Sequence, residues 1–160
     1  MFSRIIMCAA TTLFIGNVAQ ADETLKWRHV LHSGSLQTLQ VGDVPGHALN
    51  VYRLPGIVFF SDGSTGTSQV FGASDVVNGN GTANGYQVIG FNDGSELWFK
   101  YIGTIKIDGA KNPRVGTFVV TGGKGRYAGA KGDGTWDGGL SQPGTDAAVF
   151  YIDVVANIRK

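Results

Sequence analysis

After its first 21 residues, the chain consists mainly of short stretches in which apolar and polar positions alternate, separated by Gly, Asn and Asp. Alternation with a period of two is typical of β-strands that bury one face, and almost no stretch has the helical period. The turn sequences "SDGS", "NGNG" and "NDGS" favour hairpins, because Asp-Gly and Asn-Gly suit turns with positive φ. We therefore predict an all-β fold with nine candidate strands: Leu25–Leu39, Ala48–Leu54, Ile57–Phe60, Ser68–Val77, Thr82–Phe91, Glu96–Ile107, Gly116–Thr121, Gly132–Gly138 and Ala147–Ile158.

Eight or nine strands in one domain predict closure into a barrel, because closure removes the exposed edges of a sheet. Two of the predicted strands each have one apolar face, which is expected when one side of the sheet is buried. Every second residue from Ala148 to Ile158 is apolar, and Phe99 and Tyr101 lie on the apolar face of their strand. Trp98 and Ile102 interrupt the polar face of that strand. Apolar residues on an outward face predict that copies of the chain associate.

The stretch "GGKGRYAGAKGDGTWDGG" at 122–139 has glycine at nearly every second position. It contains a weak match to a dinucleotide-binding fingerprint, which works only when a helix follows. The glycines that follow oppose a helix, since each costs about 1 kcal/mol relative to alanine. We therefore expect no nucleotide cofactor, and no other cofactor, but a tight turn and a glycine-rich strand. Glycine in a strand marks a bend or the close approach of another chain.

The first 21 residues resemble a secretory signal, with Arg4, an apolar run and a small-x-small site ending at Ala21. The alternative is a buried helix of the fold. Cleavage would leave residues 22–160 as one barrel domain, secreted or periplasmic, without Cys8, the only cysteine. Without Arg4 the chain has 12 basic and 12 acidic residues. This balance of charges predicts no binding to nucleic acid and, once the signal is removed, none to a membrane. It favours small molecules or other proteins as partners.

The segment "GTFVVTGGKGRYAGAKGDGTWDG" resembles the signature of the allene oxide cyclase and dirigent-like barrel superfamily, in which a strand runs into a G-G-x-G-R-[YF]-x-G-A-x-G turn. The resemblance implies an eight-stranded antiparallel barrel that forms dimers or trimers around an apolar lumen. Known roles of the superfamily are the cyclisation of an unstable epoxide and the stereochemical guidance of a radical or quinone-methide coupling. The cyclases rely on a lumen carboxylate and a pocket cysteine. Residues 22–160 contain no cysteine, which argues against cyclase activity of the plant type.

Alternation along the strands places several polar and aromatic side chains toward the lumen. His29 and Tyr101 are the candidate catalytic residues, because histidine exchanges protons near neutral pH and a tyrosine hydroxyl can stabilise charge on an oxygen. For each, the alternative is a buried side chain with a satisfied partner. The candidate ligand-binding residues are Trp27, Asn50, Tyr52, Tyr86, Phe99 and Arg126. Alternation also predicts that Asn84 faces inward.

Arg126 and Tyr127 match the turn of the superfamily signature. We expect Tyr127 to plug one end of the barrel and Arg126 to bond turn carbonyls or a carboxylate, the alternative being an anionic ligand. No residue pattern predicts a metal site, since the two histidines of His29-x-x-His32 would point to opposite faces of a strand.

The sequence thus predicts an exported barrel that binds a small apolar molecule and guides a cyclisation or isomerisation. Two alternatives remain open at this point, namely a lipocalin-like carrier without catalysis and a structural barrel whose interior is packed by its own side chains.

Overall fold

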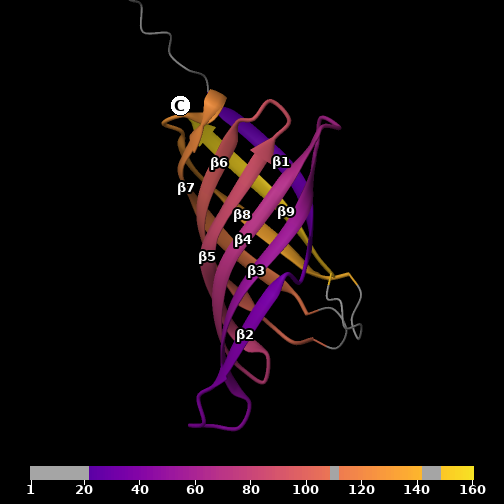
Figure 1. Cartoon of the computed structure of the whole chain (residues 1–160), viewed down its shortest axis with the longest axis vertical. Coiled ribbons are helices and arrows are strands. Elements are labelled where there is room, and N and C mark those ends of the chain that lie inside the picture. Colours follow the sequence, from indigo (N-terminus) through magenta and orange to yellow (C-terminus); the bar gives the residue numbers. More distant parts are fainter. Residues whose placement is uncertain (1–21, 109–111, 142–148) are drawn as a thin grey trace, which may run out of the picture.

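The computed structural model describes residues 22–108, 112–141 and 149–160, and most of them lie in β-strands (Figure 1). The predicted all-β class is confirmed. The predicted signal peptide, residues 1–21, lies outside the described residues. The elements are β1 (Glu23–His32), β2 (Ser35–Gln40), β3 (His47–Phe60), β4 (Thr65–Val77), β5 (Asn80–Phe91), β6 (Glu96–Ile105), β7 (Arg114–Lys124), the short 3-10 helix η1 (Gly125–Tyr127), β8 (Lys131–Leu140) and β9 (Val149–Arg159).

The strands form one antiparallel sheet in the order β1-β9-β8-β7-β6-β5-β4-β3-β2, and β1 also pairs with β3. This last pairing closes β1 and β3 to β9 into a barrel of eight strands, as predicted. β2 is an additional strand that lies beside β3 outside the closed ring. Because each strand from β3 to β9 pairs with its chain neighbour, short hairpin turns make most of the connections.

The boundaries of the first strands differ from the prediction at two places. The predicted strand 25–39 is divided into β1 and β2, whereas the two predicted strands on either side of Pro55-Gly56 form the single strand β3. Both differences have one cause, since β3 changes its neighbour here. It pairs with β2 from Ala48 to Arg53 and with β1 from Gly56 to Phe60. A proline, which has no N–H to donate, fits the point between the two ladders.

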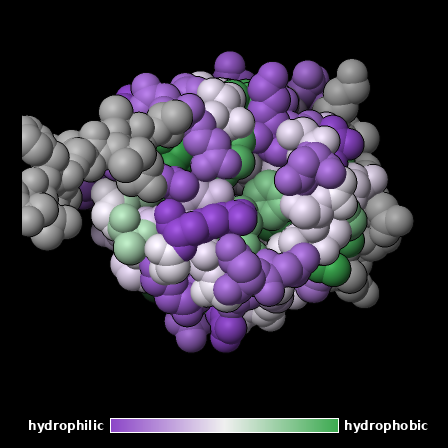
Figure 2. Space-filling model, turned by 90° about the horizontal axis from the view of Figure 1, so that it is seen from above, coloured by the Kyte–Doolittle hydropathy of each residue, from purple (hydrophilic) through white to green (hydrophobic). Residues whose placement is uncertain are grey.

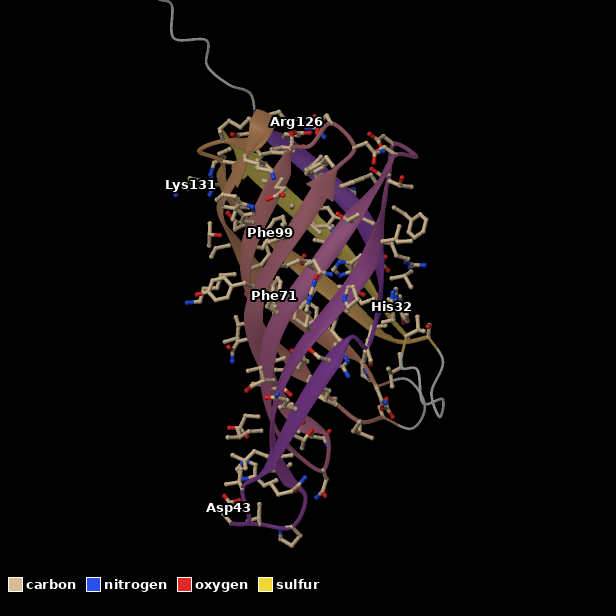
Figure 3. The ribbon with its side chains drawn as sticks, viewed as in Figure 1. His32, Asp43, Phe71, Phe99, Arg126 and Lys131 are labelled. Atoms are coloured by element: carbon tan, nitrogen blue, oxygen red, sulfur yellow. The ribbon has the colours of Figure 1, made fainter. Side chains whose placement is uncertain are left out.

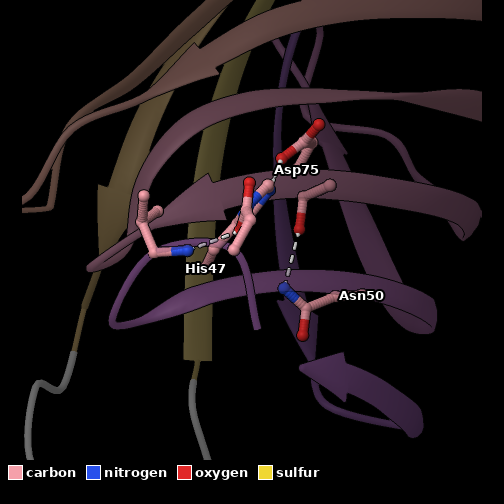
Figure 4. Close-up of polar contacts among 6 residues, drawn as sticks. His47, Asn50 and Asp75 are labelled. Carbon is pink, nitrogen blue, oxygen red and sulfur yellow. Dashed lines mark hydrogen bonds and ion pairs between the residues drawn. The ribbon is translucent and has the colours of Figure 1, made fainter. Parts of the chain in front are cut away.

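The hairpin of β2 and β3 extends beyond the closed part of the barrel, and every residue of β2 is exposed (Figure 1). His47 anchors its loop to the neighbouring strand (Figure 4). The Nδ1 atom of His47 lies 2.5 Å from Asp43 and Nε2 lies 2.8 Å from Asp75. Hydrogen bonds to Asp75 and Asp43 raise the pKa of His47.

Aromatic side chains fill the end of the barrel beside η1. Trp27 lies 5.8 Å from Phe99 between ring centroids, and Phe99 meets Phe118 edge to face at 5.0 Å. Nearer the end, Phe91 packs between Phe60 and Tyr127, with centroid separations of 5.0 and 4.8 Å. Tyr127 is 1% exposed and closes this end, as predicted. Seen from this end, hydrophilic side chains surround a hollow with hydrophobic residues at its floor (Figure 2).

The glycine-rich strand β8 presents alternate glycines and Trp136 to the interior, while Asp133, Thr135 and Asp137 are exposed. The Trp136 indole lies against Gly103 of β6 and Gly116 of β7, where a Cβ atom on either glycine would collide with the ring. The predicted close approach is therefore found inside the barrel, where glycines make room for a large ring.

Candidate functional site

The interior of the barrel contains a cavity of about 70 Å³ on the side away from η1. A groove of about 240 Å³ lies next to it, beneath the hairpin of β2 and β3. Five residues line both spaces and therefore mark the mouth of the lumen: Tyr52, Leu54, Ile105, Arg114 and Phe150. Cavity and groove therefore adjoin at these residues, and apolar side chains line most of both.

Two tyrosines from different strands meet in this passage. The hydroxyl of Tyr52 on β3 lies 3.1 Å from that of Tyr101 on β6. Burial raises the pKa of both hydroxyls, most strongly at Tyr101, where the neighbouring Tyr52 adds to the effect. Both side chains therefore stay neutral. Because one hydroxyl donates its proton to the other in this hydrogen bond, the second hydroxyl can still donate a hydrogen bond to a ligand.

The space for this pair depends on two glycines. A Cβ atom at Gly72 on β4 would collide with the hydroxyl of Tyr101 and with the Tyr52 ring, and one at Gly85 on β5 would lie 2.9 Å from the same hydroxyl. The two glycines thus make room for the hydroxyls, because neither has a Cβ atom that would collide with them.

His29 lies at the inner end of the cavity and is 2% exposed. Its Nδ1 atom accepts a hydrogen bond from the amide of Gln87 at 2.7 Å, and Ser68 lies 3.4 Å away. With Nδ1 accepting, the ring proton is on Nε2, which is buried and has no hydrogen-bond partner. Burial lowers the pKa of His29 to about 3. A neutral imidazole of this kind donates a hydrogen bond to a ligand but is a weak base.

Among the described residues that line the cavity and the groove, Arg114 is the one that carries a charge. It begins β7 and lies on the same inward face as Phe118 and Val120. The guanidinium carbon lies 4.5 Å from the centre of the Phe150 ring, and the buried Nε atom has no hydrogen-bond partner. Burial lowers the pKa of Arg114 below its ordinary value.

Arg114 is not among the residues predicted from the sequence, because the expected strand begins only at Gly116. The alternation itself could have found it. Extending the inward positions Val120 and Phe118 by two steps of two residues leads through Gly116 to Arg114.

The predicted lumen residues divide into three groups. His29, Tyr52 and Tyr101 line the cavity, whereas Trp27 and Phe99 are buried in the aromatic core between the cavity and η1. Figure 3 labels Phe99 within the barrel. Asn50 lines the outer groove, where its amide donates to Ser74 at 3.1 Å (Figure 4).

The predicted inward facing of Tyr86 and Asn84 is wrong. Tyr86 is 55% exposed, and Asn84 is exposed on the same outer face of β5. The inner face of β5 carries Ala83, Gly85 and Gln87 instead. Small residues are needed there because Tyr101 on the neighbouring strand already fills the space.

Arg126 lies at the end of the barrel opposite the hairpin that carries Asp43 (Figure 3). Its guanidinium pairs with Asp93 at 3.3 Å and lies 4.6 Å from the centre of the Phe91 ring. Arg126 thus forms the expected bond to a carboxylate within the chain. The aromatic plug, formed by Phe60, Phe91 and Tyr127, separates Arg126 from the lumen.

Two findings concern the described residues alone. They contain no cluster of three or more His, Cys, Asp and Glu side chains arranged to hold a metal ion. They also form no helix long and apolar enough to cross a membrane.

No protein-family model and no curated protein sequence matches the chain. Solved structures do match. The pterocarpan synthase dirigent protein GePTS1 aligns over 88% of this chain and 87% of its own, with 16% identity and a TM-score of 0.52. The pterocarpan synthase dirigent protein PsPTS1 aligns over 89% and 98%, with 15% identity and a TM-score of 0.51. The chain therefore has the dirigent-like barrel fold, as the turn signature predicted.

Proposed function

We propose that the protein binds a small, largely apolar molecule in its lumen. The observation that carries this proposal is the cavity with its adjoining groove, both lined mainly by apolar side chains with a few polar groups. Sites for small molecules have this composition, with few polar groups to orient the ligand. The dirigent proteins of the same fold support a ligand-guiding role. Export and a secreted or periplasmic location remain part of the proposal.

The size of the cavity limits the ligand. An inner space of about 70 Å³ holds a single small ring or a short chain, with the remainder of a ligand in the groove. The interior of an eight-stranded barrel is just wide enough to be filled by its own side chains. A barrel without a ligand is thus the main competing interpretation.

A guided cyclisation or isomerisation is the second candidate function. It is favoured by the polar side chains that line the cavity, namely His29 and the tyrosine pair. Donors placed in a dry cavity can stabilise negative charge that develops on an oxygen. With a pKa of about 3, His29 would act through its N–H rather than as a base near neutral pH.

The tryptophans provide a direct test by NMR. The indole of Trp136 lines the lumen, whereas that of Trp98 donates to Glu96 on the outer surface. Titration with the neutral probe phenylacetamide should shift the Trp136 indole N–H signal saturably and leave that of Trp98 in place. Equal shifts at both indoles would place the probe on the surface and contradict lumen binding.

Two matched variants locate the probe. Ala83→Leu adds three carbon atoms to the lining of the cavity and should weaken binding at least about tenfold. Ala73→Leu makes the same change on β4, opposite the outward-facing Asn84, and should leave binding unchanged. If native mass spectrometry of the exported protein also shows no added mass, and no probe binds, the protein is a structural barrel.

A further inference from the structure

Arg114 differs from the arginines on the outer surface of the barrel. Arg28, Arg126 and Arg159 each form an ion pair with an aspartate. Arg53 donates from Nε to the side-chain oxygen of Gln69 at 2.6 Å. Among the described residues, no acidic side chain forms an ion pair with Arg114.

The surroundings of Arg114 make an unpaired charge costly. The side chain is half-buried, its Nε atom is shielded from water, and the Phe150 ring covers the guanidinium carbon. A guanidinium keeps its charge even when it is partly desolvated. A buried donor without a partner costs free energy, which an acceptor brought by a ligand would recover.

The position of Arg114 shows where that acceptor would lie. The residue lines both the inner cavity and the outer groove, at the mouth where they join. Tyr52 and Tyr101 line the inner cavity with it and add a neutral hydroxyl donor. One positive charge beside neutral donors suits a ligand with a single negative charge, and the planar fork of arginine matches a carboxylate.

We propose that Arg114 binds the carboxylate of a small organic acid, whose apolar body extends inward against Trp136 and Phe118. This inference rests on the proposed function, since it concerns the same lumen and adds the chemical class of its ligand. The charge of the ligand would then set its orientation, with the carboxylate at the mouth and the apolar end inside.

The test compares phenylacetate with phenylacetamide, which have the same apolar body and differ in charge. Affinities are taken from the shift of the Trp136 indole N–H signal. In the unaltered protein, phenylacetate should bind at least about tenfold more tightly, because truncating one partner of a buried charged pair has a large effect. Arg114→Met should abolish this preference, mainly by weakening phenylacetate binding, and Arg114→Lys should keep part of it.

The outcomes separate the two proposals. Equal affinity of the unaltered protein for both probes, or an unchanged preference in Arg114→Met, overturns the carboxylate site but leaves lumen binding intact. Absence of binding by either probe overturns the proposed function and this inference with it. Should Arg114→Met fail to fold, the unaltered protein and Arg114→Lys still decide the question, since the first must show the preference and the second must reduce it.

Discussion

At the scale of single residues, the lumen is shaped as much by missing side chains as by present ones. The tyrosine pair occupies space left free by Gly72 and Gly85, and the indole of Trp136 lies against Gly103 and Gly116. Each of these glycines is an inward position of a strand, where a larger residue would displace an aromatic ring. A pattern that counts only apolar residues therefore overlooks part of the lumen lining.

Buried His29 leads to a prediction about acid stability. Its pKa is about 3 in the folded chain and about 6.5 when unfolded, so between these values the unfolded state binds the additional proton. This contribution to stability is complete above pH 6.5 and is lost as the pH falls toward 3. At pH 4.5 the free energy of unfolding should be lower by roughly 2–3 kcal/mol for this reason.

The measurement is urea unfolding of the unaltered protein and of His29→Gln between pH 4.5 and 8. Glutamine cannot titrate, so the variant should lose less stability across this range. Parallel pH profiles for the two proteins would show that His29 does not stay neutral in the fold.

The sequence predicted the facing of most lumen candidates but failed at two kinds of position. Alternation places Tyr86 inside, yet the pattern of β5 fits either face, and the space that Tyr101 takes on the next strand favours Gly85 as the inward residue. Arg114 is missed because the expected strand begins only at Gly116, two residues further along the chain. The first error concerns a tertiary contact that the pattern of a single strand does not contain, whereas the second concerns the residue at which the strand begins.

At the scale of elements, the point where β3 changes its neighbour determines how the barrel closes. A Cβ atom at Gly56 would collide with the backbone carbonyl of Val30 on β1. Gly56 therefore lets β1 and β3 approach closely enough to pair. The sequence showed the Pro-Gly pair but gave no partner for it, so two strands were predicted where the structure has one.

Gly56→Ala should therefore destabilise the protein by about 1–3 kcal/mol, because backbone atoms must shift to accept the methyl group. The matched control is Gly90→Ala, whose Cβ would approach only the side-chain hydroxyl of Thr67. Chemical denaturation of both variants measures the difference. Equal losses of stability would mean that the contact between β1 and β3 at Gly56 is not critical for closure.

At the scale of the whole molecule, the outer surface carries exposed apolar side chains on adjacent strands. Phe71 on β4 lies opposite Tyr86 on β5, with exposures of 45% and 55%, and Ile102 on β6 and Val119 on β7 are 60% and 51% exposed. We propose that copies of the chain meet at this surface, as the sequence predicted for a homodimer or homotrimer.

Sedimentation velocity tests this proposal. Ile102→Lys should shift the protein toward the monomer, because a charge in an apolar interface loses its hydration. Val155→Lys makes a similar change on β9, away from this surface, and should leave the oligomer intact. A monomeric unaltered protein, or equal effects of the two variants, would contradict an interface at β4 to β7.

The aromatic plug at η1 has a consequence for how molecules would exchange with the lumen. Because Tyr127 and Phe91 close that end, a ligand would enter and leave the cavity through the same mouth. A molecule cannot turn around in so narrow a space, so the part that enters last must leave first. The end of a ligand that passes Arg114 first would therefore lie innermost, and the ligand would keep this orientation until it dissociates.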